Sequence, residues 1–337
     1  MRDCVNACRG ALLTGIAFRR VFGIAGLVVV LMGTTETTPA AAQDTVKVAI
    51  GQRGSWSTAV VELGQRAGFF KKKDITADIL YTSGGGETIQ AVISGAVDVG
   101  VALGTASVMG AFSKGAPIRI IGGAFTGATD TLWYVPSSSS IHTLKDIKGG
   151  KTIAFSSVGS STHLYALSAI NEFKLDARAV ATGSLTSTFT QTMSGQVDVG
   201  WSAPPVGLKE DEEGKIRIIG SGAELPAYRN QTMRVLGTNV MALEQRRDVL
   251  LRFMQAYRDT IEWLYASPEG VKMFAADTKI PESIALRTRD EFLPKSGMLA
   301  DRVEGFEGLT KDAIAFKFLN SPLSPEQLKT LVQVPFK

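Results

Sequence analysis

The sequence contains an internal repeat whose two copies lie one hundred residues apart. Residues 93–100 read ISGAVDVG and residues 193–200 read MSGQVDVG, so that six of eight positions agree. The pentapeptide IRIIG also occurs twice, at residues 118–122 and 216–220. Two matches in the same order indicate that the chain builds two lobes of similar local construction.

Each copy of the octapeptide places a glycine, Gly95 or Gly195, where a helix is expected to end and a buried strand to follow. Glycine ends helices readily because it adopts the left-handed conformation without a Cβ clash. Asp98 and Asp198 could be interpreted as a catalytic carboxylate pair. We do not favour this interpretation, because both begin a strand, whereas open α/β sheets bind ligands at the carboxyl ends of strands.

Short apolar strands alternate with helical segments from residue 45 onward. Strands are expected at 46–50, 75–81, 97–103 and 118–121, with helices between them. This alternation is typical of an α/β protein whose strands pair in parallel through right-handed crossovers.

The order of the elements predicts that the chain leaves one lobe, builds a second and then returns. We expect residues 43–131 and 236–337 to form lobe 1, and residues 132–235 to form lobe 2. Beyond residue 240 the pattern is mostly helical, so helices are expected to complete lobe 1. The two crossings form a two-strand hinge, and the cleft between hinged lobes is a natural ligand site.

Residues 1–42 have the three zones of an export signal. A basic region ending at Arg19-Arg20 precedes an apolar run over 21–32, and Ala40-Ala41-Ala42 offers an A-x-A cleavage site before Gln43. The apolar run is shorter than the roughly 20 residues that span a bilayer. We therefore expect a cleaved signal peptide and a periplasmic protein. The paired arginines leave both the Sec and the twin-arginine route open.

Composition excludes several classes of function. Both cysteines, Cys4 and Cys8, lie in the expected signal peptide, and the chain has only two histidines. The mature protein therefore lacks a thiol nucleophile and thiolate metal ligands, and we expect no cofactor and no metal. With 36 basic and 32 acidic residues, the net charge of +4 gives no reason to expect binding to nucleic acid or to an anionic membrane.

A series of short motifs resembles a known family. The motifs are ELG at 62–64, AGFF at 67–70, QAVISG at 90–95, KGAP at 114–117, LKDIKG at 144–149 and GSSTH at 159–163. In this order they resemble the periplasmic solute-binding proteins of the nitrate/sulfonate/taurine type, a family similar to the thiamine-precursor-synthase-like group. The resemblance implies the type II periplasmic binding fold, with two α/β lobes and a helical C-terminal part.

The resemblance also implies a function. A monomer of this family would deliver a small solute, here a sulfonate- or carboxylate-like organic anion or zwitterion, to the permease and ATPase of an ABC importer. Enzymes on this fold that cleave sulfinates or build the thiamine pyrimidine use cysteines, which the mature chain lacks. A periplasmic lyase or hydrolase is one alternative, and the receptor of a secondary transporter or a sensor is another.

Four loops are expected to line the cleft, because each follows the carboxyl end of a strand. The candidate ligand contacts in these loops are Ser55, Trp56, Gly85, Gly86, Thr105, Ala106, Ser160, Ser161, Thr162, Trp201 and Ser202. Thr126 and Asn230 are further candidates near the crossings, whereas Arg53 and His163 are left open.

The turn at 159–162 is the strongest candidate. It lies between a strand and a helix, so free N–H groups, hydroxyls and the helix dipole could hold an anion there. Ser160 or Ser161 could instead only cap the helix, and both roles are compatible.

Overall fold

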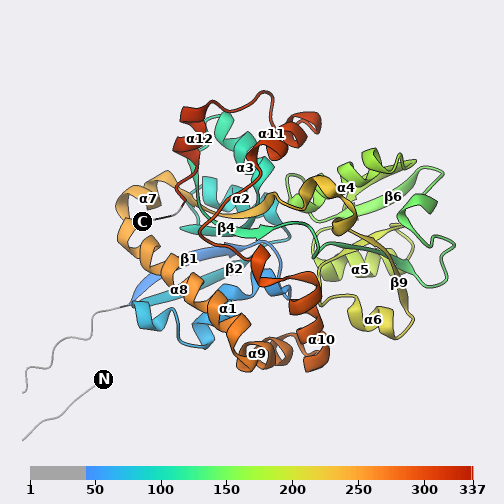
Figure 1. The fold of residues 1–337 in the computed structure, drawn as a ribbon, viewed down its shortest axis with the longest axis horizontal. Coiled ribbons are helices and arrows are strands. Elements are labelled where there is room, and N and C mark those ends of the chain that lie inside the picture. Colours follow the sequence, from blue (N-terminus) through green and yellow to red (C-terminus); the bar gives the residue numbers. More distant parts are fainter. Residues whose placement is uncertain (1–42, 335, 337) are drawn as a thin grey trace, which may run out of the picture. The chain divides into compact units, whose positions relative to one another are not determined.

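The computed structural model describes residues 43–334 and residue 336 (Figure 1). The export signal expected over residues 1–42 lies outside these residues. All described residues belong to one compact unit. Within that part of the chain, no helix combines the length and the apolar character that a membrane span requires.

The first sheet has five strands in the order β2-β1-β3-β10-β4. The strands are β1 (Asp44–Ile50), β2 (Ile75–Tyr81), β3 (Val99–Gly104), β4 (Ile118–Thr126) and β10 (Thr232–Asn239). β1 pairs in parallel with β2 and β3, as the alternation predicts, but β10 pairs antiparallel with β3 and β4. Parallel pairing throughout is therefore wrong for this sheet, because β10 enters it from the returning chain and not through a helical crossover.

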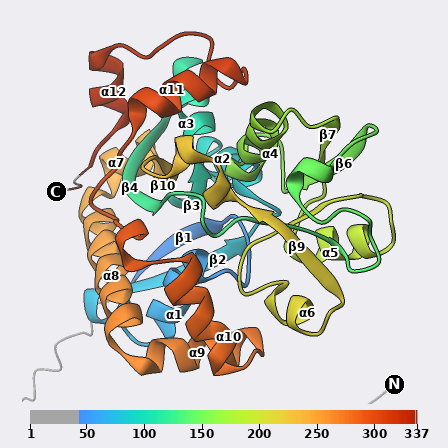
Figure 2. The ribbon, with the colours of Figure 1, turned by 45° about the vertical axis from the view of Figure 1, so that its right-hand side comes forward.

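The second lobe repeats this arrangement (Figure 2). Its strands are β5 (Leu132–Pro136), β6 (Lys151–Phe155), β7 (Ala177–Ala181), β8 (Gly200–Ser202) and β9 (Ile216–Ser221). β8, β5 and β9 form one antiparallel sheet, and β6 pairs in parallel with β7. A parallel bridge between Ile153 and Val199 joins the two groups. The resulting order, β7-β6-β8-β5-β9, matches that of the first sheet strand by strand.

The sequence repeat occupies equivalent places in the two lobes. The octapeptides lead into β3 and β8, and the two copies of IRIIG lie in β4 and β9. The equivalence also extends upstream, because the Thr82 and Thr88 hydroxyls hydrogen-bond at 2.7 Å and those of Thr182 and Thr188 at 2.6 Å. The two lobes thus share one local construction, as the repeat indicates.

Asp98 and Asp198 have matching structural partners. Asp98 accepts a 2.8 Å hydrogen bond from the Lys47 backbone N–H, and Asp198 accepts one of 2.9 Å from the Thr152 backbone N–H. Each carboxylate thereby ties the start of its segment to the neighbouring strand, and Asp198 also pairs with Lys151 at 2.8 Å. Neither aspartate lines the cavities described below.

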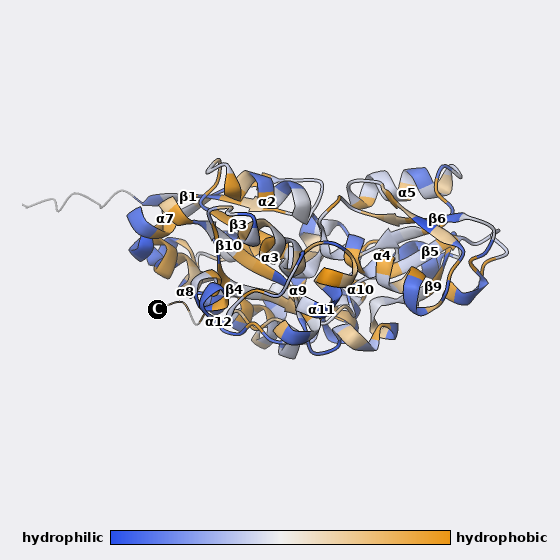
Figure 3. Ribbon diagram, turned by 90° about the horizontal axis from the view of Figure 1, so that it is seen from above, coloured by the Kyte–Doolittle hydropathy of each residue, from blue (hydrophilic) through white to orange (hydrophobic). Residues whose placement is uncertain are grey.

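Helices cover both sheets, and the chain beyond β10 is mostly helical. The helices are α1 (Val60–Arg66), α2 (Gly85–Ile93), α3 (Thr105–Ser113), α4 (Ser161–Glu172), α5 (Leu185–Met193), α6 (Leu208–Glu212), α7 (Val240–Gln245), α8 (Arg247–Ala266), α9 (Pro268–Thr278), α10 (Glu282–Arg287), α11 (Phe306–Ala315) and α12 (Pro325–Leu331). α8 buries Phe253, Tyr257 and Ile261 at helical spacing in the core beside β1 and β3. Figure 3 shows apolar residues gathered along β4 and β10.

The helical part also contacts the second lobe. Ile284 of α10 packs in a buried cluster with Leu132 of β5 and Leu208 of α6. Beside this cluster, Arg287 and Glu212 form an ion pair at 3.2 Å. An apolar and an ionic contact therefore join α10 to β5 and α6.

Candidate functional site

A small cavity lies between the two sheets, where β1, β3, β6 and β8 end. The residues that line it are Gly51, Gln52, Ser55, Thr58, Gly85, Ala102, Thr131, Ser156, Ser160, Ser161, Thr162, Trp201, Ala203 and Arg234. We call this space the inner cavity. Its volume of about 30 Å³ has room for roughly two water molecules. The lobes are thus nearly closed upon it.

Arg234 supplies the charge of the inner cavity. It projects from β10, is 8% exposed and donates a 2.6 Å hydrogen bond from Nη2 to Oδ2 of the fully buried Asp130. The guanidinium also lies over the Phe125 ring, 4.8 Å from its centroid. Burial lowers the pKa of Arg234, but the charge and hydrogen bond of Asp130, together with Tyr165 and Tyr257, more than offset burial, so the pKa is raised overall. The guanidinium is therefore permanently charged.

The Arg234–Asp130 pair has unused hydrogen-bonding capacity. Nε of Arg234 and Oδ1 of Asp130 are buried and find no partner among the described residues. Buried polar atoms without partners are uncommon, because each forfeits the hydrogen bonds it would make to water. Since Arg234 lines the cavity and Asp130 does not, a guest in the cavity would meet the cation.

The start of α4 contributes donors to the same cavity. Ser160 is the N-cap, and its Oγ accepts a 3.1 Å hydrogen bond from the His163 N–H, so it does cap its own helix. The backbone N–H groups of Ser161 and Thr162 have no hydrogen-bond partner among the described residues. The Thr162 hydroxyl contacts Ser156 Oγ at 2.9 Å and fixes the loop. The turn at 160–162 therefore both caps α4 and lines the inner cavity.

Trp201 adds a third kind of donor. It lies on β8, lines the inner cavity and is 2% exposed. Its indole Nε1 is buried without a partner among the described residues. Of the lining residues only Arg234 is charged, and none is a carboxylate, a histidine or a cysteine. The inner cavity is therefore rich in donors and suited to an anion.

The glycine run at 84–86 has a different role from the one expected. Gly85 and Gly86 are candidate ligand contacts, but the run faces the loop at 156–159 of the other lobe. A Cβ on Gly84 would lie 2.8 Å from Ser156 Oγ, and one on Gly86 would collide with the Val158 carbonyl oxygen. The Gly86 N–H donates a 3.3 Å hydrogen bond to Ser157 Oγ. The run therefore lets the two lobes meet, and of the two candidates in it only Gly85 lines the inner cavity.

Trp56 was expected to wall the cleft, but it lies in the core. Its side chain is fully buried and packs edge-to-face against Phe274, with ring centroids 4.9 Å apart. The indole N–H donates to the Tyr265 hydroxyl at 3.2 Å. Aromatic partners from α8 and α9 turn this side chain away from the cavity, and its neighbour Ser55 lines the cavity instead.

Three further candidates are buried beside the inner cavity without lining it. The Thr105 hydroxyl donates to the Thr232 carbonyl oxygen at 2.6 Å, and the Ser202 hydroxyl donates to the Val206 carbonyl oxygen at 2.5 Å. Ala106 belongs to the apolar core. These side chains support the loops, because their polar atoms are already used.

The remaining candidates lie elsewhere. Thr126 and Asn230 line a separate pocket of about 340 Å³ beside the crossings, and Gly86 lines a groove of about 480 Å³ next to α3. His163 stacks on Phe155, with ring centroids 4.2 Å apart, and burial lowers its pKa. A neutral, stacked His163 offers no charge to a ligand.

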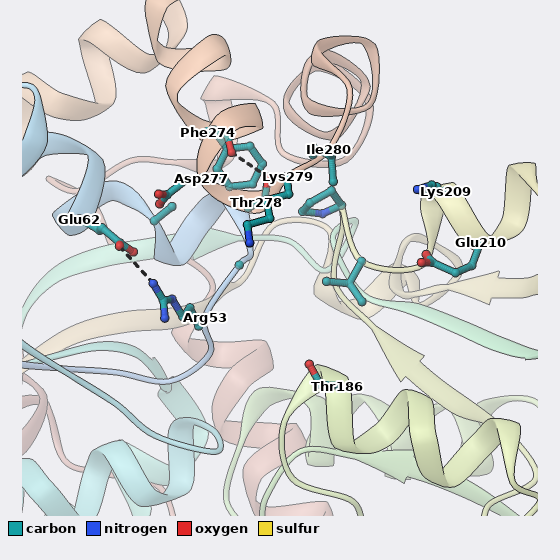
Figure 4. Close-up of a pocket in the computed structure, with 14 residues that line it drawn as sticks. Arg53, Glu62, Thr186, Lys209, Glu210, Phe274, Asp277, Thr278, Lys279 and Ile280 are labelled. Atoms are coloured by element: carbon teal, nitrogen blue, oxygen red, sulfur yellow. Dashed lines mark hydrogen bonds and ion pairs between the residues drawn. The ribbon is translucent and has the colours of Figure 1, made fainter.

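A larger pocket lies on the other side of the loop at 51–59 (Figure 4). It has a volume of about 430 Å³. It is lined by Arg53, Gly54, Ala59, Glu62, Thr186, Pro205, Val206, Lys209, Glu210, Phe274, Asp277, Thr278, Lys279 and Ile280. We call it the outer pocket. Arg53 lies here, paired with Glu62 at 3.6 Å, and not in the inner cavity.

Arg234 and Asp130 are the functional candidates that our sequence reasoning missed. A signal for Arg234 exists, because MRVLG at 233–237 places one arginine in an otherwise apolar strand. Charged residues are rarely fully buried unless they are paired. Its partner Asp130 is 104 residues away in sequence and only the fold brings the two together.

Several solved structures have a fold similar to that of this chain. The alkanesulfonate-binding protein SsuA from Xanthomonas axonopodis pv. citri bound to MOPS is similar, with a TM-score of 0.67 and 19% identity over 82% of this chain and 92% of that one. The periplasmic nitrate-binding protein NrtA from Synechocystis PCC 6803 has a TM-score of 0.66 and 12% identity, with 86% of each chain covered. The desulfurization enzyme DSZB has a TM-score of 0.59 and 14% identity over 84% of this chain and 95% of that one.

These similarities show the periplasmic binding fold that the sequence motifs imply. A search of curated proteins gave no match. The family model described as NMT1/THI5 like matches residues 57–271, which include most of both sheets and every residue of the inner cavity beyond position 56. The chain therefore belongs to the NMT1/THI5-like family.

Proposed function

We propose that the protein is a periplasmic solute-binding protein that delivers a small organic anion or zwitterion to an ABC importer. The observation that carries this proposal is the set of unpartnered donors around one buried cation. Arg234, the indole N–H of Trp201 and the N–H groups at the start of α4 all border the inner cavity. No carboxylate among the described lining residues opposes them.

The chemistry of recognition follows from these donors. Hydrogen bonds to a charged group contribute about 1.5–3 kcal/mol each, more than bonds between neutral groups. The start of α4 adds its dipole, which favours negative charge at a helix N-terminus. A sulfonate or carboxylate head group would therefore accept hydrogen bonds from donors that have no acceptor in the closed cavity.

Closure is part of the proposed mechanism. An inner cavity of about 30 Å³ cannot admit an organic anion from outside while the lobes touch at 84–86 and 156–159. Opening about the two crossings, which lie between β4 and β5 and between β9 and β10, would admit the solute, and closing would bring both sets of loops onto it. A closed, liganded form is also a shape that a membrane permease could distinguish from the open form.

An enzymatic function on the same fold is the rival. The DSZB neighbour shows that the fold can support catalysis. In this chain the serines and threonines that line the inner cavity have no histidine or carboxylate beside them in that lining. Such hydroxyls lack the base that activates a nucleophile. Incubation with candidate sulfonates and carboxylates should leave them unchanged, and product formed at a catalytic rate would favour the enzyme.

The decisive test removes the cation without leaving a buried lone charge. Arg234→Met with Asp130→Asn deletes both charges of the pair, and Arg258→Met with Asp301→Asn does the same to a surface pair that is 2.7 Å apart. Calorimetry with alkanesulfonates, carboxylates and nitrate should show that the first double variant loses about 2–5 kcal/mol of binding free energy. Retained affinity in a folded Arg234/Asp130 variant would exclude the proposed site.

Export can be tested separately. The signal expected over residues 1–42 predicts that the periplasmic species begins at Gln43 and contains no cysteine. Mass spectrometry of the mature protein from a periplasmic extract measures this directly. A mature protein that retains Cys4 or Cys8 would contradict periplasmic processing at this position.

A further inference from the structure

We propose that the outer pocket receives the body of the solute and that Glu210 binds a cationic group at its far end. This inference rests on the proposed function and specifies the class of solute. It makes the ligand a zwitterion with two separated charges: an anionic head in the inner cavity and an ammonium or similar donor at the end of an apolar spacer.

The sizes of the two spaces require a divided ligand. The inner cavity, at about 30 Å³, can hold little more than a head group, whereas the outer pocket of about 430 Å³ lies within the usual range for organic ligands. The two spaces share walls. On the first lobe Ser55 and Thr58 line the inner cavity and Ala59 lines the outer pocket. On the second lobe Ala203 lines the inner cavity and Pro205 lines the outer pocket. In the proposed binding mode the ligand passes between these two loops, with its head group in the inner cavity and its body in the outer pocket.

The middle of the outer pocket is apolar. Pro205 and Val206 come from the second lobe, and Ala59, Phe274 and Ile280 come from the first. Neither lobe alone forms this wall, so its surface is completed only when the lobes approach each other. An alkyl or similar spacer between the two charged ends would fit this wall.

Glu210 stands out among the acidic residues of the outer pocket. Glu62 pairs with Arg53 at 3.6 Å, and Asp277 pairs with Arg66. No ion pair or side-chain hydrogen bond joins the half-buried carboxylate of Glu210 to another described residue. Figure 4 shows this carboxylate extending from α6 toward the space between the two lobes. The Glu210 charge also acts on Lys215, but that lysine forms its ion pair with Glu213 at 2.7 Å. A half-buried carboxylate that has no ion pair or side-chain hydrogen bond of its own is suited to receive a cation from the ligand.

The cationic residues of the outer pocket do not take this role from Glu210. Lys209, its neighbour in sequence, pairs with Glu213 at 3.7 Å. Lys279 lies on the opposite lobe and is exposed, so solvent screens its charge. Arg53 is also exposed and already paired with Glu62 at 3.6 Å. A second anionic group on the ligand would therefore meet paired or solvent-screened cations, whereas an ammonium group would meet Glu210.

The test uses matched ligands and a matched variant. Propane-, butane- and hexanesulfonate are compared with their terminal-amino and terminal-carboxylate counterparts, and the same series is made with carboxylate heads. The protein is wild type, Glu210→Gln or Glu212→Gln. Glu212 is the control, because it lies on the same helix and removes the same charge but pairs with Arg287 outside the pocket. Binding is measured by calorimetry.

We expect affinity to rise about fourfold for each methylene that enters the apolar wall. At the optimal length the amino ligand should bind the wild type up to about fivefold more tightly than the methyl-terminated one, which is the upper end for a partly exposed ion pair. Glu210→Gln should abolish this preference and Glu212→Gln should retain it. An unchanged preference in Glu210→Gln, or tighter binding of the terminal carboxylate, would overturn the inference.

The outcomes separate this inference from the proposed function. If no sulfonate or carboxylate binds the wild type at any length, the anion site itself is wrong. If plain alkanesulfonates or carboxylates bind and depend on Arg234, but a terminal amine adds nothing, only the role of Glu210 is wrong.

Discussion

Replacement of Asp130 by asparagine should have opposite effects on stability and on ligand affinity. The substitution keeps the shape of the side chain but leaves the Arg234 guanidinium, 2.6 Å from Asp130, as an uncompensated buried charge. The exposed fractions of the two side chains are only 10% and 0%, so solvent cannot take over the role of the carboxylate. Breaking such a pair costs about 3–5 kcal/mol. The ligand-free variant should therefore unfold at a clearly lower urea concentration.

Affinity should change in the other direction. In the wild type, Asp130 already neutralises the cation that we expect an anionic solute to meet. Two like charges about 8 Å apart repel by about 2 kcal/mol at an effective dielectric constant of about 20, which corresponds to more than a tenfold change in affinity. Without the Asp130 charge, an anion should bind at least about tenfold more tightly and restore much of the lost stability.

Urea titration without ligand and calorimetry with a sulfonate or carboxylate measure the two effects. Asp301→Asn is the control, because its partner Arg258 is 2.7 Å away in a pair whose exposed fractions are 26% and 53%. Loss of an exposed pair costs about 0–1 kcal/mol. An Asp130→Asn variant that is no less stable than Asp301→Asn, or that binds the anion less tightly than the wild type, would contradict this prediction.

Three other substitutions test separate features. Gly86→Leu should keep the fold but block closure against the loop at 156–159, so that scattering shows no compaction with ligand; Gln90→Leu, exposed on the same helix, should close normally. Trp201→Phe removes a buried, unpartnered N–H, and calorimetry should show anion binding weakened by about 1–3 kcal/mol; equal affinity would mean that Nε1 does not reach the ligand. Burial raises the pKa of Asp198, but hydrogen bonds from Lys151 and Thr152 outweigh burial and hold its pKa below the ordinary value. Asp198 should therefore stabilise the fold at neutral pH and lose this contribution as the pH falls below about 4, so the stability gap to Asp198→Asn, measured by urea titration, should shrink in acid.

The sequence predicts the construction of the lobes because the repeat is local. Helix end, glycine and strand follow one another within eight residues, so their physical requirements are visible in the order of residues. The longer equivalence of Thr82 and Thr88 with Thr182 and Thr188 also has the offset of one hundred residues, and a search at that spacing would have found it. The antiparallel placement of β10 is not visible in this way, because it depends on where the returning chain enters the sheet.

The lining of the inner cavity could be predicted best where a loop follows its own strand. Ser55, Gly85, Trp201 and the turn at 160–162 line the inner cavity, because the carboxyl ends of parallel strands converge there. Trp56 shows the limit of this reasoning. Its loop is correctly placed, but its Tyr265 partner is 209 residues away and Phe274 is farther still. Contacts at that sequence distance decide which way a side chain turns, and no local pattern contains them.

The contacts between the lobes also indicate where the cleft opens. On the side of α10, Ile284 is buried against Leu132 and Leu208, and the Arg287–Glu212 ion pair adds to this contact. Separating these groups would expose apolar surface to water at a cost that grows with its area. On the side of α2, the glycine backbone at 84–86 meets a serine-rich loop through one 3.3 Å hydrogen bond, which water can replace. The lobes should therefore separate first between α2 and the loop at 156–159, so that the start of α4 and its free N–H groups are exposed to an incoming anion before the outer pocket opens.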